Sequence, residues 1–170
     1  AQRKTTSRGP CVSTTPSART TPAAASSAPQ SSIARNECTA AGILRSVERQ
    51  LVPAISPQAA TVGYSRAVRD GRHVHVAGTA PIGTDTSDPY EQAKRCLEIV
   101  VQALAEVGAR PEHVVRTRVY LVDAGDWEAV GRAHGEVFAD VRPASAMLVI
   151  AGLLDPRWKV EIEAEALLPE

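Results

Sequence analysis

The stretch Ser65–Gly78, SRAVRDGRHVHVAG, decides the fold, because it holds two strand-like runs joined by Asp70 and Gly71. An Asp-Gly pair tolerates the positive φ angles of a tight hairpin turn, so the sequence predicts a β-hairpin here. From Thr61 onward, the turn residues, helix caps and apolar periodicity of successive segments are consistent with one folded domain. We therefore assign residues 61–170 to one folded domain that opens with this hairpin.

The elements expected after the hairpin alternate between helix and strand. Residues 87–109 have Ser87 or Asp88 as N-cap, Pro89 at the first helical position and Gly108 at the end, which predicts an amphipathic helix. The order ββαβαββ is completed by a strand at 113–123, a helix at 125–140 and strands at 144–152 and 159–167. The fold class is α+β, a sheet with two helices on one face.

Two helices cannot cover both faces of such a sheet, so one face is left to solvent or to another subunit. Alternation in the last strand places Glu161, Glu163 and Glu165 on that face. In the strand at 113–123, alternation places Val114, Arg116 and Arg118 there, and Val115 and Thr117 on the opposite face. Cross-strand ion pairs on a wet face and a subunit interface are both compatible with this pattern.

The first 60 residues differ from the domain in composition. Residues 1–36 contain five basic and no acidic residues among Ser, Thr, Ala and Pro, so we expect residues 1–41 to be a disordered basic extension. Leu44, Val47 and Leu51 have helical spacing and Pro53 ends the pattern, which predicts a short helix and linker within residues 42–60. An organelle transit peptide is the alternative interpretation of the extension.

Charge, apolar run length and cysteine content argue against several classes of protein and site. Nineteen basic residues balance nineteen acidic ones, so a nucleic-acid partner is not expected. Apolar runs are too short to cross a bilayer, so no membrane role is expected. Three cysteines without CxxC spacing suggest neither a disulfide framework nor a zinc site. A reducing, cytoplasmic location fits best, with organelle import as the alternative.

Several separated motifs, in order, resemble one family. They are GYSRAVRDGRHVHVAGTAP, YEQAKRCLEIVVQALAEVGA, VVRTRVYLVD, RPASAMLV and VEIEAEA. This arrangement is similar to that of the RidA (YjgF) family of reactive enamine and imine deaminases. The resemblance implies a chorismate-mutase-like α+β fold, a homotrimer with clefts between subunits, a small carboxylate or carbonyl metabolite as ligand, and no cofactor. For the active branch it implies hydrolysis of a 2-imino acid to a 2-keto acid and ammonia.

The resemblance also implies site residues. Tyr64 in VGYS and Glu161 in VEIEA match the family's cleft tyrosine and the glutamate that positions the attacking water. Gly78 and Thr79 in AGT match the turn whose backbone contributes to the cleft. Ser145 in RPASA stands where active members have the arginine that binds the substrate carboxylate, with Ala146 and Met147 beside it. On this basis the chain resembles subfamilies that lack the arginine.

Arg132 is our candidate for the missing positive charge, because active members often carry a cleft-facing Asn at its position. The alternative is structural: Glu128, Arg132 and Glu136 are spaced i, i+4, i+8, as in an exposed ladder of ion pairs. Arg142 is a second, weaker candidate.

Two other constellations are disfavoured. His73 and His75 share a strand face, but no third ligand for zinc follows from the sequence. His134 falls on an apolar stripe and is expected in the core. A triad of Ser145, His134 and Asp123 lacks the sequence of a nucleophile elbow.

Three functions remain open from the sequence. The first is a hydrolase of an imine, enamine or related carbonyl compound, supported by Tyr64 and Glu161. The second is a trimeric ligand-binding or regulatory module without catalysis, supported by Ser145. The third, an RNA-acting translation inhibitor, is disfavoured by the balanced charge.

Overall fold

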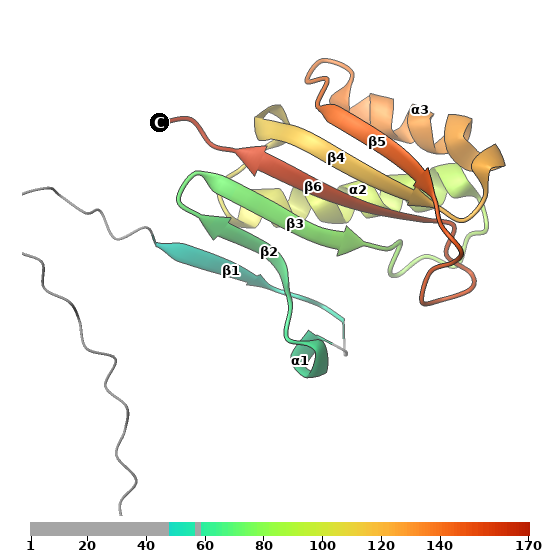
Figure 1. The fold of residues 1–170 in the computed structure, drawn as a ribbon, viewed down its shortest axis with the longest axis horizontal. Coiled ribbons are helices and arrows are strands. Elements are labelled where there is room, and N and C mark those ends of the chain that lie inside the picture. Colours follow the sequence, from blue (N-terminus) through green and yellow to red (C-terminus); the bar gives the residue numbers. More distant parts are fainter. Residues whose placement is uncertain (1–47, 57–58) are drawn as a thin grey trace, which may run out of the picture. The chain divides into compact units, whose positions relative to one another are not determined.

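A six-stranded sheet with two long helices on one face forms the domain, as Figure 1 shows. The computed structural model describes residues 48–56 and 59–170. The spatial order of the strands is β1-β2-β3-β6-β4-β5. Their bounds are β1 Arg49–Pro53, β2 Ser65–Asp70, β3 His73–Thr79, β4 Val114–Leu121, β5 Ala144–Val149 and β6 Val160–Leu167. All pairs are antiparallel except β4 with β5, which is parallel.

The predicted hairpin is β2 and β3, with Gly71 at φ 60° in its turn. Helix α2, Pro89–Glu106, begins at the Asp88 N-cap, whose side chain accepts a hydrogen bond from the backbone N–H of Tyr90. It ends before Gly108, at φ 77°. Helix α3, Trp127–Phe138, follows β4. The short elements are α1 Ala59–Val62 and the 3₁₀ turns at Pro111–His113 and Ala124–Asp126. The ββαβαββ order and the α+β class are confirmed.

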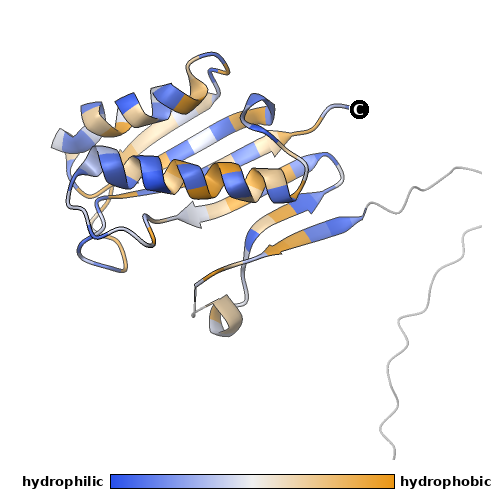
Figure 2. Ribbon diagram, turned by 180° about the vertical axis from the view of Figure 1, so that it is seen from behind, coloured by the Kyte–Doolittle hydropathy of each residue, from blue (hydrophilic) through white to orange (hydrophobic). Residues whose placement is uncertain are grey.

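The core lies between the sheet and the two helices. Figure 2, seen from the helical side, shows α2 and α3 lying over the strands. Apolar side chains of α2 pack against β3 and β6, and fully buried residues come from both layers. Among the largest are Leu97, Leu104, Val119, Val130 and Ile162. Among the residues that the structure describes, no long helix covers the opposite face of the sheet, as predicted. Within the described residues, no helix is long and apolar enough to cross a bilayer.

The predicted helix before the domain is wrong where the structure describes it. Residues Arg49–Pro53 form β1, which pairs antiparallel with β2. Without β1, the backbone N–H and C=O groups along the outer side of β2 would be unpaired, and main-chain pairing there outweighs the propensity of a short helix. The predicted extension, residues 1–41, and the first part of the predicted helix lie outside the described residues.

The alternation predicted for β4 is also wrong at its start. The register of β4 with β6 shifts between Val114 and Arg116. Val114 is therefore 3% exposed and packs in the core, while Val115 is 49% exposed. A bulge of this kind places two residues opposite one and reverses the faces of the residues before it. From Arg116 onward the predicted faces are correct, and Thr117 is buried.

Candidate functional site

The carboxyl group of Glu161 lies directly against the backbone of Gly78. Strands β3 and β6 are neighbours, and their register shifts between Val76 and Thr79. A Cβ atom placed on Gly78 would clash with Glu161 Oε1, so only glycine leaves room for the carboxyl group here. The two residues whose matches implied a common cleft are therefore in contact within one chain.

A buried guanidinium supports the same corner of the sheet. Arg66 is 4% exposed, and its Nη1 donates to the carbonyl of Gly78 at 3.0 Å and to Thr79 Oγ1 at 2.8 Å. Arg66 Nε is buried without a hydrogen-bond partner among the residues described. Sequence reasoning passed over Arg66, because an arginine in a hairpin strand is usually solvated. Its position next to the GYS and AGT motifs was the available signal.

Burial raises the pKa of the Glu161 carboxyl above its ordinary value. The Arg66 guanidinium acts in the opposite direction by stabilising the charged form, and Glu163 raises the pKa slightly further. Desolvation is the larger effect, as expected for a carboxyl group partly withdrawn from water. A carboxylate with a raised pKa is a better proton acceptor near neutral pH than an ordinary surface glutamate.

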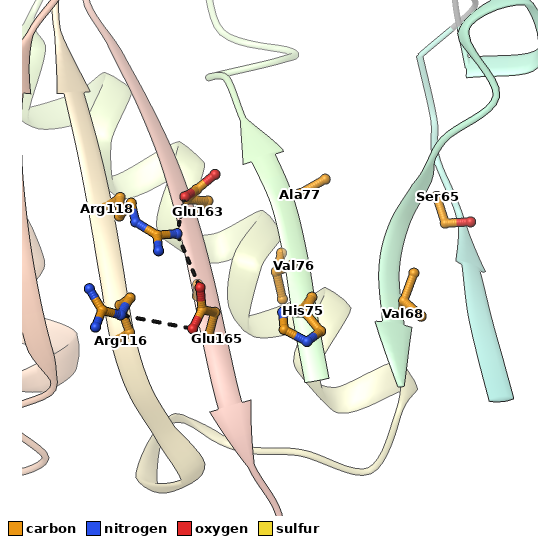
Figure 3. A pocket seen from close by; sticks show the side chains of 10 residues that line it. Ser65, Val68, His75, Val76, Ala77, Arg116, Arg118, Glu163 and Glu165 are labelled. Carbon is orange, nitrogen blue, oxygen red and sulfur yellow. Dashed lines mark hydrogen bonds and ion pairs between the residues drawn. The ribbon is translucent and has the colours of Figure 1, made fainter. Parts of the chain in front are cut away.

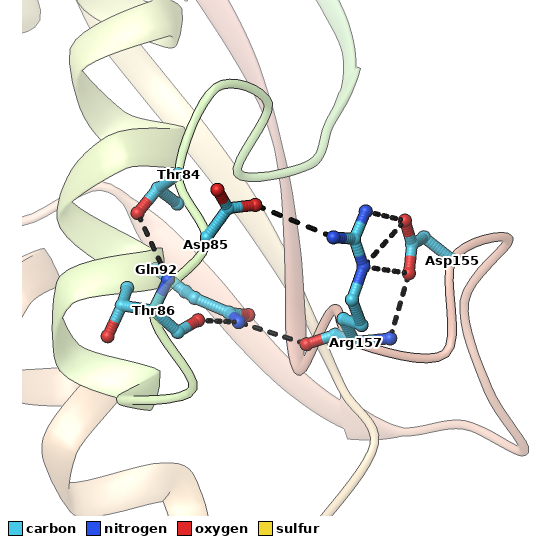
Figure 4. A network of polar contacts seen from close by, with 6 residues as sticks. All are labelled: Thr84, Asp85, Thr86, Gln92, Asp155 and Arg157. Carbon is cyan, nitrogen blue, oxygen red and sulfur yellow. Dashed lines mark hydrogen bonds and ion pairs between the residues drawn. The ribbon is translucent and has the colours of Figure 1, made fainter.

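A polar network fixes the segment that leads into Glu161, and Figure 4 shows it. Gln92 of α2 is 2% exposed; its Nε2 donates to the carbonyls of Thr86 and Arg157 at 2.7 and 3.0 Å. Its Oε1 accepts from the backbone N–H of Lys159 at 2.8 Å. On the outer side of the loop, the Arg157 guanidinium holds Asp155, whose pKa is lowered to about 2. The first turn of α2 thus positions the start of β6.

A second group of predicted residues lies on β5 and α3. Thr117 Oγ1 donates to Ser145 Oγ at 2.9 Å and lies 2.9 Å from His134 Nε2. Met147 follows on the same face of β5, and its Cε is 3.7 Å from the position a Cβ would take on Gly131. Ser145 is exposed on the edge strand, whereas Thr117 is 1% exposed. The His134 imidazole and the hydroxyls of Thr117 and Ser145 thus form a hydrogen-bonded chain that ends at the protein surface.

In the single chain, the Arg132 side chain contacts α2 and not Ser145. The Arg132 guanidinium lies over the Tyr90 ring of α2, 4.3 Å from its centroid, while Gly131 and His134 are the α3 residues next to β5. The ion-pair ladder through Arg132 is absent from the described chain, since Glu136 instead accepts from the Tyr90 hydroxyl at 2.7 Å. The structure therefore has a cation–π contact in place of the ladder, and the role of Arg132 toward a ligand stays a prediction.

The predicted site residues fall into two groups, one on β3 and β6 and the other on β5 and α3, and strand β4 lies between β6 and β5. Gly78, Thr79 and Glu161 lie together with Arg66, and Tyr64 precedes that arginine by two residues. Arg132, Ser145 and Met147 belong to the α3 side, whereas Ala146 pairs with Arg118 on the open side. The Asp123 carboxylate caps the turn before α3 by accepting from Gly125, so Ser145 and His134 form no triad with it.

The open face of the sheet carries paired charges and a shallow pocket. Figure 3 shows the pocket, with Arg116 and Arg118 turned toward Glu163 and Glu165. Arg118 contacts both glutamates and Arg116 lies 3.9 Å from Glu165. His75 lines the same pocket. No cluster of metal-ligating side chains occurs among residues 48–56 and 59–170.

Comparisons with known proteins identify the family of the chain. A family model described as endoribonuclease L-PSP matches residues 54–168. A Streptomyces coelicolor protein described as uncharacterized is 45% identical over 115 residues, 65% of this chain and 86% of that protein. Mouse 2-iminobutanoate/2-iminopropanoate deaminase is 31% identical, covering 73% of this chain and 95% of the enzyme.

The solved structures give the same assignment. A crystal structure of a Mycobacterium tuberculosis member of the YjgF family aligns with a TM-score of 0.67 and 39% identity, over 71% of this chain and all of that one. The fold is consistent with the chorismate-mutase-like fold expected from the resemblance. Since the family match covers more than half of the residues, the chain belongs to the endoribonuclease L-PSP family, which includes the RidA and YjgF proteins.

Proposed function

We propose that the protein hydrolyses a small imine or enamine in clefts between the subunits of a homotrimer. The observation that carries this proposal is the contact of Glu161 with Gly78. It holds a carboxyl group of raised pKa against a backbone segment, and both residues are half-buried in the single chain. Similarity to the mouse deaminase supports the class of reaction.

The reaction needs a proton acceptor and a place for the substrate. Glu161 takes a proton from water as the water oxygen attacks the imine carbon, and returns a proton to nitrogen. Glu161 then removes the hydroxyl proton of the resulting carbinolamine and delivers it to nitrogen as the carbon–nitrogen bond breaks, giving a carbonyl compound and ammonia. Tyr64 and the backbone of Gly78 and Thr79 bind the substrate beside the attacking water. No metal or organic cofactor takes part in the proposed reaction.

A neighbouring subunit is proposed to complete each cleft. Within one chain, strand β4 separates the two groups of site residues, so we infer that the second group beside each small ligand comes from a neighbouring subunit. All six residues of β5 are exposed, including Met147, Leu148 and Val149 at 39%, 44% and 58%. Exposed apolar residues on an edge strand favour burial against another copy. On this proposal, β5 and α3 of one subunit face the Glu161 group of the next.

Ser145 is proposed to occupy the position of the family arginine. A bidentate arginine–carboxylate contact is worth about 1.5–3 kcal/mol, roughly twice a neutral hydrogen bond, so a serine binds a 2-imino acid more weakly. This same feature favours the second candidate, a trimeric module that binds a small metabolite without hydrolysing it. An RNA-cleaving role receives less support, because the arginines of the open face are paired with glutamates.

Imine hydrolysis can be tested with two generated substrates. An amino-acid oxidase supplies 2-iminobutyrate, an amine oxidase supplies an uncharged imine from a primary amine, and semicarbazide traps the imine that remains. The wild type is expected to accelerate the loss of at least one imine, and Glu161→Gln to lower that rate about 100-fold or more. Glu106→Gln, at an exposed position of α2, is the control. No acceleration of either imine would leave the binding module as the function.

A further inference from the structure

The Ser145 side chain is hydrogen-bonded to Thr117, and Thr117 is in turn hydrogen-bonded to His134. Thr117 Oγ1 is 2.9 Å from Ser145 Oγ and 2.9 Å from His134 Nε2, and Thr117 is 1% exposed. The chain begins at a partly buried imidazole, passes through a buried hydroxyl, and ends at an exposed hydroxyl on the edge strand.

With Thr117 Oγ1 as the donor to Ser145 Oγ, the number of protons sets the direction of the rest of the chain. A hydroxyl carries one proton, and Thr117 donates its proton to Ser145 Oγ. The contact of Thr117 with His134 is then donated by the imidazole, which places a hydrogen on Nε2. Because Ser145 Oγ already accepts from Thr117, its own proton is available to a ligand. Consecutive hydrogen bonds polarise one another, so Ser145 is a stronger donor than an isolated serine.

Within the described residues of the same chain, the two arginines considered as partners of Ser145 are engaged elsewhere. The Arg132 guanidinium is held over the Tyr90 ring, and Arg142 Nε donates to the carbonyl of Ala139. Burial lowers the pKa of His134, which favours the uncharged imidazole. The subsite thus offers one polarised neutral donor beside the apolar Met147 side chain.

We propose that the Ser145–Thr117–His134 chain is a subsite for an uncharged oxygen of the ligand, a carbonyl or carboxamide, and selects against a carboxylate. This inference rests on the proposed function, because it names the substrate class for the same cleft. Ser145 contacts the ligand, while Thr117 and His134 are positioning residues that orient and polarise its hydroxyl. The physiological substrate is then an imine or enamine without a carboxylate next to the reacting carbon.

The test uses two probes of similar shape, 2-oxobutanamide with an uncharged carboxamide and 2-oxobutyrate with a carboxylate at the same position, and measures their affinities by titration calorimetry with the full chain. We expect the wild type to bind the amide more tightly. Ser145→Ala should weaken amide binding about tenfold, equivalent to about 1.4 kcal/mol, with little effect on the acid. Thr117→Val keeps the shape of the side chain and should reduce the preference for the amide without touching the ligand. Ser145→Arg should reverse the preference.

The control is Ser87→Ala, an exposed serine before α2, which should leave both affinities unchanged. Thr117 is buried, so circular dichroism must show that Thr117→Val is folded; the exposed Ser145→Arg variant decides the question if it is not. Tighter binding of the acid by the wild type, or an unchanged ratio in Ser145→Ala and Ser145→Arg, overturns this inference even when imine hydrolysis is observed. Binding of neither probe, together with no hydrolysis, overturns both proposals.

Discussion

Gln92 Oε1 accepts a hydrogen bond from the backbone N–H of Lys159, two residues before Glu161. Gln92→Leu keeps a similar volume but leaves buried backbone groups of Lys159 and Arg157 without partners. We expect it to lower the free energy of unfolding by about 2–4 kcal/mol, since each orphaned buried group costs about 1–3 kcal/mol. Urea denaturation measures the loss. Gln102→Leu, the same change at an exposed position of α2, should be nearly neutral, and equal effects would contradict the role of Gln92.

Gly78→Ala should separate catalysis from folding. Gly78 is not among the glycines of positive φ, so its backbone accepts alanine, but the new Cβ displaces the Glu161 carboxyl. A displacement of about 1 Å can cost about 100-fold in rate, so imine hydrolysis should fall by that order while the melting temperature changes little. Gly135→Ala, in α3 with no atom near its Cβ position, should keep activity. Full activity in Gly78→Ala would show that hydrolysis does not depend on the contact between Gly78 and Glu161.

Arg66→Met should move the pH dependence of hydrolysis. The Arg66 charge lowers the pKa of Glu161 against the larger opposing effect of burial, so its loss raises that pKa further. If ionised Glu161 accepts the proton from water, the acid limb of kcat/KM moves to higher pH and the rate recovers in alkaline buffer. Arg110→Met, an exposed arginine beside Glu112, is the control. An acid limb that stays in place would show that Glu161 is not the proton acceptor.

Leu148→Glu should dissociate the proposed trimer. Leu148 is 44% exposed on edge strand β5, where a carboxylate costs little in a single chain but must be desolvated at an interface. Sedimentation velocity should show smaller species, with the circular dichroism spectrum retained and hydrolysis lost. Ala105→Glu on the exposed side of α2 should keep the assembly of the wild type. A wild-type chain that sediments as a monomer would contradict the proposal directly.

Local signals were sufficient to predict most of the fold. The turn at Gly71, the cap at Asp88 and the end of α2 before Gly108 each depend on neighbours in the sequence, and the structure has all three. The half-covered sheet follows from the number of helices and strands. Ion pairing of Arg116 and Arg118 with glutamates of β6 was also predictable, because alternation places them on one face.

Features that depend on distant partners were missed. β1 is a strand because β2 offers it a free edge, which no periodicity within 42–55 reveals. The bulge at Val114–Arg116 reverses the first residues of β4, and only the register with β6 defines it. In the site, the motifs indicated Gly78 and Glu161 but not buried Arg66. The link from His134 to Ser145 runs through Thr117, which belongs to a third element.

The close packing of the Glu161 carboxyl against the backbone of Gly78 also affects which substitutions elsewhere in the protein the site tolerates. An acid held only by neighbouring side chains moves whenever those neighbours are exchanged, but main-chain atoms are present whatever residues surround them. Volume-conserving exchanges among core positions such as Leu97 and Val100 should therefore be tolerated without disturbing the acid, whereas any side chain in place of Gly78 puts a Cβ atom where the Glu161 carboxyl lies.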